Sequence, residues 1–546
     1  MRMNPAAEQL ESWKEIARYL KRSVRTARRW EHEEDLPVHR HVHHTRASVF
    51  ALRAEIDAWR RTRAESPRTP GATVTARAAA PKASIAVLPF ENLSAEPDNE
   101  YFAAGLTEEI TTTLSKVQAL RVTSRTSALT LRGSAKTATA IAKLLRTRYL
   151  LQGSVRRFGP RLRISAQLID GISDAHRWAD TFEGHLDDVF AMQEKLARLI
   201  VAALKLHLTA RDEQRLAARA ISNVAAYERY LRARQEGWRW RRDAIDRAVR
   251  LLDEALRIEG DSAPLYAALG VAYLQYREAG IDLSERPLQQ AQRCAAQVLA
   301  LEPRSPAALQ LRGWIHYSRG QLQAAVHDLK EALAGEPYNA DTLLLLCNCY
   351  IVSGHVAAAR PLLQRLATID PLTPISLCMP AFADIMEGKF ARALKPYRQM
   401  FELDPANPLA RLFYVWVLIL NRRPRQAVAL VQACPPDVHD SLAAWVMRLL
   451  AAAVTGKLEQ APRALPPALA ALAAATDMFP RFLAQAFALA DQRAAALRWL
   501  QVAIERGFIN YPFLARHDPC FKRLRRDVRF QRLLKRAEKR CKSFVA

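Results

Sequence analysis

The chain has 546 residues and a formal net charge of +26, because 81 Lys and Arg stand against 55 Asp and Glu. Half of the residues are hydrophobic, which excludes a disordered polycation and predicts several folded domains. The basic excess predicts attraction to a polyanion, either nucleic acid or an anionic lipid surface. Seven cysteines, mostly inside apolar runs, favour reduced, buried thiols over a disulfide framework.

Residues 11–31 predict two short helices joined by a tight turn. Ser12 is a suitable N-cap for the first helix, and Glu15 completes a capping box. Ser23 caps the second helix. Apolar and basic side chains separate on that second helix, with Val24, Ala27 and Trp30 on one side and Arg25, Arg28 and Arg29 on another. This pattern is typical of a helix-turn-helix with a basic outer face.

The residues that follow predict a wing. Residues 36–50 contain two short β-like runs, and 52–61 predict a third helix. Over about 11–62 this order resembles the winged helix-turn-helix of MerR-type regulators and phage excisionases, most specifically in SVRTARRWE (23–31). The resemblance implies that DNA is contacted by Ser23, Arg25, Thr26, Arg28, Arg29, Trp30, Arg40 and Arg46, the last two from the wing. MerR proteins continue into a long dimerisation helix, whereas this chain continues into a linker at 63–82, so dimer formation does not follow from the resemblance.

Two other interpretations of the head remain open. It could be a small helical domain that binds protein instead of DNA. His39, His41 and His43 would share one strand face and could ligate a metal, although a solvated wing along the phosphates is favoured. Protonation of these histidines below about pH 6.5 would then strengthen DNA attraction.

Residues 63–82 are rich in Ala, Pro and Thr and predict a flexible linker, and residues 83–207 predict an α/β domain. Strands are expected at 84–90, 120–127 and 176–182, and a hairpin around Gly159 and Pro160. Helices are expected at 106–117, 137–147 and 188–206. In the first helix Thr107 would be the N-cap, and the buried side chains would be Leu106, Ile110 and Leu114.

This domain resembles the TolB amino-terminal-like domain through AVLPF, YFAAGLTEEI, LLQGSVRR and AQLID. The resemblance implies an α/β sensing or interaction module without established catalytic residues. Its acidic side chains and His176 are interpreted as caps and turns; the carboxylates are Asp98, Glu100, Asp170, Asp174, Asp180 and Asp187. No nucleotide-binding, hydrolase or metalloprotease motif is present, so we expect no enzymatic activity, no catalytic residue, no cofactor and no metal.

A period of 34 residues runs through 223–510 and predicts a solenoid of helical hairpins. The positions in register are Pro303, Pro337, Pro371 and Pro405; Gly320, Gly354 and Gly388; and Ala325, Ala359, Ala393 and Ala427. Glycine would end the first helix, alanine would let the second helix pack closely, and proline would break the chain before the next hairpin. The segment resembles tetratricopeptide repeats, which implies a concave face that receives a protein or peptide.

The uncharged stretch at 342–359 contains Asn348 and His355 and is explained as a repeat helix better than as a membrane span. Residues 511–546 are strongly basic and predict a capping segment with a polar outer face, with a second polyanion contact as the alternative. The start of the chain lacks the apolar segment of a secretory signal. We therefore expect a cytoplasmic protein with no membrane contact.

The predicted fold is multidomain: a small winged helix-turn-helix, then an α/β domain, then an all-α solenoid. The predicted function is that of a bacterial transcriptional regulator that binds double-stranded DNA, senses or relays a signal through 83–207, and recruits a protein partner. Self-association would raise the affinity of a single head. The alternative is a non-enzymatic interaction scaffold whose head binds protein.

Overall fold

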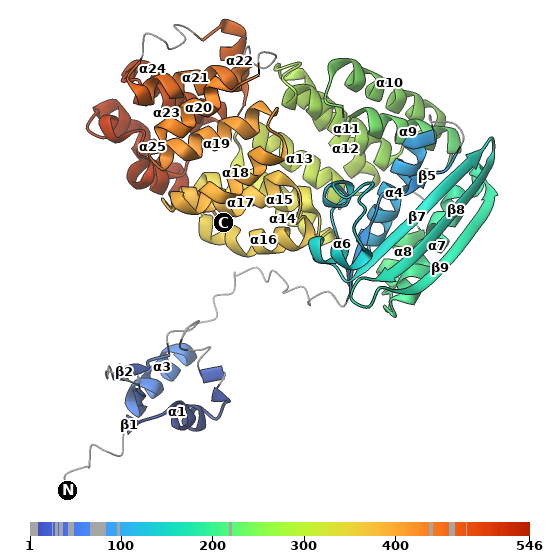
Figure 1. Cartoon of the computed structure of the whole chain (residues 1–546), viewed down its shortest axis with the longest axis horizontal. Helices are drawn as coiled ribbons and strands as arrows, with labels where there is room; N and C mark the ends of the chain where they lie inside the picture. The colour runs from blue at the N-terminus through green and yellow to red at the C-terminus, as the bar shows by residue number, and fades with distance from the viewer. Residues whose placement is uncertain are drawn as a thin grey trace. The chain divides into compact units, whose positions relative to one another are not determined.

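The computed structural model describes residues 9–24, 26–27, 31, 36–41, 48–65, 83–94, 99–217, 221–237, 239–435, 441–457, 465–476 and 478–546. The chain divides into two compact units, Met1–Ala79 and Ala80–Ala546 (Figure 1). The α/β region and the helical repeats therefore belong to the same unit.

The first unit begins with the predicted capped helix, α1 (Trp13–Leu20). The Ser12 hydroxyl accepts a hydrogen bond from the Glu15 amide at 3.3 Å, and the Glu15 carboxylate accepts one from the Glu11 amide at 2.8 Å. Lys21 ends the helix in the left-handed conformation, with φ of 53°. The next helical residue is Val24.

A small antiparallel sheet completes this unit. Its strands are β1 (Gln9–Leu10), β2 (His39–His41) and β3 (Ser48–Leu52), in the order β1-β3-β2. β1 was not predicted, because two residues carry no alternation. Helix α3 (Arg53–Glu65) is longer than predicted and takes the first residues of the expected linker, which is a correction at 63–65. The core consists of Leu10, Ile16, Ala17, Leu20, Ala27, Leu36, Ala51 and Ile56.

The second unit starts with a mixed sheet in the order β6-β4-β7-β8-β9. These strands are β6 (Leu120–Val122), β4 (Ala83–Val87), β7 (Tyr149–Phe158), β8 (Arg161–Asp170) and β9 (Ala175–His185); β5 (Glu91–Asn92) pairs with β7. β4 is parallel to both neighbours, whereas β7, β8 and β9 form an antiparallel meander. The predicted hairpin is confirmed, with Phe158 opposite Arg161 at its turn.

Helices cover the two faces of this sheet unequally. α4 (Glu100–Ser115) and α7 (Val189–Ala203) share a core with the inner side chains of β7 and β8. On the other face, α6 (Ala138–Leu144) packs near one end of the strands, where α5 (Arg125–Leu129) also contacts β4. α8 (Ala210–Ala217) follows α7 and contacts it.

Two predicted elements of this region have different bounds. The helix expected at 106–117 begins at Glu100, so Thr107 is not its N-cap: its hydroxyl donates to the Ala103 carbonyl at 2.8 Å inside the helix. A threonine can satisfy its hydroxyl in this way at a buried helical position. The strand expected at 120–127 ends at Val122, because Ser124 caps α5 by accepting from the Ser127 amide at 3.0 Å.

The remainder of the unit is a solenoid of antiparallel helix pairs (Figure 1). The pairs are α9 (Val224–Gly237) and α10 (Arg242–Glu259), α11 (Ala263–Glu278) and α12 (Arg286–Leu301), α13 (Pro306–Ser318) and α14 (Leu322–Gly335), α15 (Ala340–Ser353) and α16 (Val356–Ile369), α17 (Pro374–Met386) and α18 (Leu394–Leu403), α19 (Pro408–Leu420) and α20 (Pro424–Gln432), α21 (Leu442–Thr455) and α22 (Pro467–Ala475), and α23 (Phe479–Leu489) and α24 (Arg493–Glu505). The chain closes with α25 (Val528–Ser543).

The residues in 34-residue register do what the sequence predicts. Gly320, Gly354 and Gly388 adopt φ of 73°, 92° and 78° between the two helices of their repeats. The alanines at 325, 359, 393 and 427 are fully buried, where a larger side chain would separate the paired helices.

The same glycines contact the end of the chain. A Cβ at Gly320 would lie 2.7 Å from the Glu505 carbonyl oxygen, and one at Gly388 would lie 2.7 Å from His517 Nδ1. Between them, the Asn510 side-chain amide donates to the Ile351 carbonyl at 2.7 Å. Residues 505–517 therefore run along the turns of successive repeats. The segment at 511–546 packs along the side of the solenoid, beyond the terminal capping that its sequence predicts.

Gly320→Ala is expected to destabilise the protein more than Gly456→Ala, which serves as its matched control. Both glycines have φ of 73°, but a Cβ at Gly456 meets nothing within 4 Å. The control measures left-handed strain, about 1–2 kcal/mol, whereas Gly320→Ala adds an overpacking cost of about 1–3 kcal/mol. Equal losses of unfolding free energy in urea would contradict the packing of the end of the chain against this turn.

Slow thiol reactivity is expected of the native protein. Six cysteines are buried, and Cys541 is partly exposed. Burial raises the pKa of Cys294, Cys347 and Cys378 to about 12, so at pH 8 only about one thiol in ten thousand at these positions is the reactive thiolate. A chromogenic disulfide reagent should label at most one thiol rapidly, and all seven in denaturant. Rapid labelling of several native thiols would contradict this packing.

Candidate functional site

One position of the first helix recurs in four successive repeats, on α13, α15, α17 and α19. Its members are Trp314, Asn348, Phe382 and Trp416, each 34 residues after the last. First helices of neighbouring repeats contact one another, as α13 does with α15 and α15 with α17. The Asn348 side-chain amide donates to the Tyr317 hydroxyl at 2.5 Å. We call this row the inner ladder.

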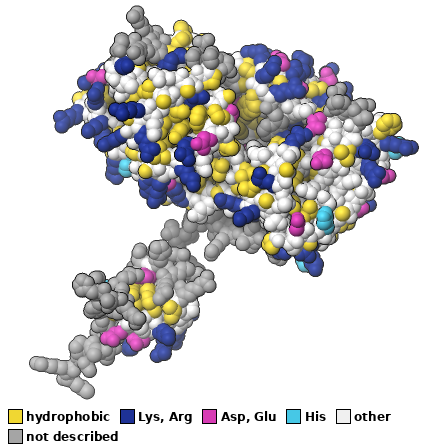
Figure 2. Space-filling model, viewed as in Figure 1, with side chains coloured by type: hydrophobic (Ala, Val, Ile, Leu, Met, Phe, Trp, Pro, Cys, Tyr) yellow, Lys and Arg dark blue, Asp and Glu magenta, His cyan; other side chains and the backbone are white. Residues whose placement is uncertain are grey.

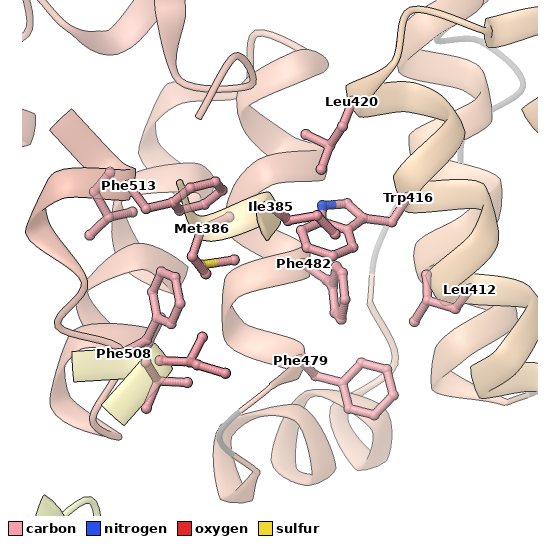
Figure 3. Close-up of a cluster of buried hydrophobic side chains, with 14 of the residues drawn as sticks. Ile385, Met386, Leu412, Trp416, Leu420, Phe479, Phe482, Phe508 and Phe513 are labelled. Atoms are coloured by element: carbon pink, nitrogen blue, oxygen red, sulfur yellow. The ribbon is translucent and has the colours of Figure 1, made fainter. Parts of the chain in front are cut away.

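The later part of the inner ladder is covered by the chain itself. The Arg481 guanidinium of α23 lies 4.7 Å from the ring centre of Trp416, 5.2 Å from Phe382 and 5.1 Å from Phe508. Arg481 is 5% exposed, so these cation–π contacts are shielded from water. Figure 3 shows Trp416 against Phe482, whose ring centres are 5.3 Å apart, with Phe508 and Phe513 beside Met386.

A buried carboxylate anchors the covering segment to α23. Asp518 is fully buried and accepts hydrogen bonds from the Gln485 side-chain amide at 2.7 Å and from the Cys520 amide at 2.9 Å. Burial raises the pKa of Asp518, against the opposing effect of its hydrogen bonds and of Arg481. The Gln485 side-chain amide of α23 thus has its partner within the chain. A partner would have to displace residues 508–520 to reach it.

The earlier repeats leave comparable positions accessible. Val271 in α11 and Trp314 in α13 each follow a glycine of the first helix, and Val271 is 48% exposed. Asp341 at the start of α15 is exposed too, although the surrounding protein raises its pKa by desolvation. Figure 2 shows the surface hollowed near α11 and α13. The candidate partner-binding surface therefore lies on α11, α13 and α15.

The α/β region contacts the solenoid first at α9. Glu108 of α4 pairs with Arg234 of α9 and with Arg125 of α5, the latter at 3.4 Å. Beside them, the Tyr230 hydroxyl donates to Glu109 at 3.2 Å. Desolvation by burial raises the pKa of Glu109 and lowers the pKa of Arg125 and of Arg234 to about 10. Such a desolvated network loses stability when one member is removed.

A second contact joins the α/β region to the loop between α16 and α17. Asp370 is 5% exposed and accepts from Ser127 at 2.7 Å and from Ser124, both in the α/β region. It also accepts from two hydroxyls of its own loop and helix, Thr373 and Ser376. The α/β region is thus held by two solenoid segments that are far apart in sequence, and the start of α5 takes part in both contacts. Neither contact could be predicted from the 34-residue register.

The less covered face of the sheet forms a polar cavity of about 600 Å³. Its strand residues include Gln152, Ser154, Ser165, Gln167 and Thr181, with loop residues 131–134 at one side. The Gln167 amide donates to Gln152 at 3.1 Å, and the hydroxyls of Ser165 and Thr181 are 3.2 Å apart. Charged side chains also line it, namely Glu91, Arg132 and Asp180. The mixture of charged and uncharged polar groups makes the cavity a candidate site for a small polar ligand.

Most predicted DNA-contacting residues lie outside the described parts of the first unit. Arg25, Arg28, Arg29, Trp30 and Arg46 belong to that group. Two others are described and contact each other. The Ser23 hydroxyl accepts from the Thr26 amide at 3.1 Å and lies 2.9 Å from the Thr26 hydroxyl, which gives Ser23 the capping position predicted for it.

The predicted wing contains a pair that sequence reasoning missed. The backbone of Arg40 pairs with Val49 in β2 and β3, while its side chain lies outside the description. His39 Nε2 is 2.6 Å from a carboxylate oxygen of Glu55, and its ring stacks on Phe50 at 5.0 Å. Glu55 is 16 residues from His39. No short-range sequence pattern therefore indicates that the two side chains meet. Among the described residues, no group of three or more potential ligands is placed to hold a metal.

Other predicted polar residues serve the fold. Asp170 accepts from Arg177 at 2.9 Å, Arg148 at 3.2 Å and the Ile172 amide, and these hydrogen bonds lower its pKa despite the opposing effect of burial. Asp174 occupies the turn after β8, with φ of 58°. Within the described residues, no helix is both long enough and apolar enough to span a membrane.

Asp370→Ala is expected to loosen the second contact. It leaves four hydroxyls without their acceptor, a loss on the order of 2–3 kcal/mol. Asp404→Ala is the matched control, because Asp404 ends α18 as Asp370 ends α16 but is exposed. Hydrogen exchange should accelerate at 124–130 in Asp370→Ala and not in the control. Unchanged exchange would contradict this contact.

Comparison with known proteins supports the repeat assignment. The tetratricopeptide repeat family model matches residues 316–375 and 384–453. A protein of Rhizobium meliloti (strain 1021) named "Putative adenylate cyclase 3" is 40% identical over 193 residues, which are 35% of this chain and 33% of that protein. The match therefore spans about a third of the relative.

Solved structures of repeat proteins are also similar. A tetratricopeptide repeat protein of Parabacteroides merdae has 13% identity and a TM-score of 0.33, over 51% of this chain and 99% of its own. A thermophilic repeat protein of Thermus thermophilus has 19% identity and a TM-score of 0.30, over 36% of this chain and 100% of its own. The C-terminal region of this chain consists of tetratricopeptide repeats, which indicates a role in protein–protein interaction.

Proposed function

We propose that this protein is a bacterial DNA-binding transcriptional regulator that recruits a protein partner through its repeats. The observation that carries the proposal is the order of elements in the first unit. A capped helix ends at Lys21 in the left-handed conformation, helical backbone resumes at Val24, and a two-stranded antiparallel hairpin follows. A helix of basic sequence between a short first helix and a wing is the arrangement that presents side chains to a major groove.

The repeats support the recruiting part of the proposal. Their inner ladder is covered at α17 and α19 by Arg481 and Phe508, whereas Val271, Trp314 and Asp341 remain accessible in earlier repeats. A partner segment with an apolar anchor and a basic group would match this combination of side chains.

The α/β region would act as the sensor. Its polar cavity is lined by strands of the same sheet whose helices α4 and α5 contact α9 and Asp370. A ligand in the cavity that favours one arrangement of α5 would therefore change contacts to the solenoid. No reaction is part of this proposal.

A second candidate is a non-enzymatic interaction scaffold whose head binds protein. The match to a protein named as a cyclase favours this second candidate. It covers about a third of each protein, which suggests that the shared segment can be joined to domains of different function. In that case the repeats would keep their role while the first unit would ignore DNA.

Binding of the full chain to a fluorescent 30-base-pair duplex separates the two candidates. Arg25→Ala with Arg28→Ala should weaken binding about tenfold or more at low salt and reduce the slope of log affinity against log salt by about 2. Arg250→Ala with Arg293→Ala is the control, because both arginines are exposed on solenoid helices. An unchanged slope in the head variant would overturn the regulator proposal.

A further inference from the structure

The end of the chain carries a dense basic surface. Between 522 and 542 the sequence has eleven Lys and Arg against two Asp and Glu. Helix α25 buries Phe530, Leu534 and Ala537 on one face. Most of its Lys and Arg side chains are exposed, and Figure 2 shows Lys and Arg gathered at the end of the solenoid where α25 lies in Figure 1.

The acidic groups near α25 are already engaged. Asp527 lies 3.0 Å from Arg529 and also caps the helix by accepting from its amide. Glu538 lies 2.7 Å from Lys542. Glu505 of α24 lies 3.2 Å from Arg536. These carboxylates therefore neutralise the flanks of the helix.

Three cations remain at the centre of the exposed face. Arg532, Lys535 and Lys539 are separated by three and four residues, so they share one side of the helix. At 100° per residue this side lies opposite Phe530, Leu534 and Ala537. Within the described part of the chain, none of the three forms an ion pair. We call these three residues the α25 stripe.

We propose that the α25 stripe binds the phosphate backbone of double-stranded DNA. The stripe places one positive charge about every helical turn, or about every 5 Å, on a rigid support. A DNA strand offers one phosphate per 3.4 Å of axis, so a helix lying along it can meet successive phosphates. Lys522, Arg523 and Arg526 are also exposed, just before the helix.

Two simpler explanations account for less. Cations in the last turn of a helix complement its dipole, which explains Arg540 and Lys542 but not Arg532 or Lys535 in the middle. A membrane-surface helix needs a free apolar face, whereas the apolar face of α25 is buried against the solenoid. A linear polyanion explains the charges of Arg532, Lys535 and Lys539 better than the helix dipole or a membrane surface does.

This inference goes beyond the proposed function, because it concerns the second unit and stands whether or not the head binds DNA. If both surfaces hold one duplex, each raises the effective concentration of the other. Contacts from the stripe carry no base recognition, so they would strengthen binding without changing its sequence preference.

The test uses the full chain with Arg532, Lys535 and Lys539 all changed to Gln. The matched control changes Arg250, Arg293 and Lys395 to Gln, since these are also exposed helical cations without an ion pair in the described structure. Anisotropy of a labelled 30-base-pair duplex is measured across salt concentrations. Both sets are repeated with Arg25 and Arg28 changed to Ala. Thermal unfolding confirms that each variant is folded.

The stripe variant should weaken duplex binding about tenfold and reduce the salt slope by about 2 to 3, in the presence and absence of the head changes. The control should leave the slope within about 0.5. A stripe effect with no head effect would overturn the proposed function and keep this inference. An unchanged slope in the stripe variant would overturn the inference. The same variants are also tested on phosphatidylserine vesicles and on single-stranded DNA, and a loss of binding confined to either of these would overturn it too.

Discussion

The arrangement of the second unit depends on the close approach of the chain's end to the turns of its repeats. Glycine allows this approach at Gly320 and Gly388, where a Cβ would lie 2.7 Å from atoms of Glu505 and His517. The same contacts direct residues 508–520 over the inner ladder of the later repeats, where Arg481 and Asp518 are buried. The proposed partner-binding surface is consequently confined to the earlier repeats, and α25 packs on the solenoid through Phe530, Leu534 and Ala537.

The α/β region adds a second constraint, because it joins two helix pairs of the solenoid that are far apart in sequence. Glu108 joins α4 to α9, and Asp370 joins the end of α16 to α5. Movement between the first and fourth helix pairs of the solenoid would strain one of these contacts. These contacts join the first and fourth helix pairs, and the accessible Val271 and Trp314 lie on the helix pairs between them.

The sequence pattern correctly predicted the features that depend on residues close together in the chain. The 34-residue register identified the turn glycines and the buried alanines, and Ser12, Ser23 and the hairpin at Gly159 behaved as predicted. The predictions were wrong where packing between distant segments determines the bounds of an element. Thr107 looks like a cap in sequence, but the helix continues seven residues upstream because Tyr101 and Phe102 have a core to enter. Asp370, Arg481 and Glu55 act through partners distant in sequence, so no spacing could reveal them.

The central claim is that residues 508–520 are part of the folded core and occupy the inner face of the later repeats. Amide hydrogen exchange of the full chain tests it directly, because the amides of Ile509, Leu514, Asp518 and Cys520 all donate internal hydrogen bonds. If the claim is right, these amides exchange as slowly as the amides of α17 and α19, because all of them become exposed only when the whole unit unfolds. Exchange within seconds at 508–520, with α17 and α19 still protected, would contradict it.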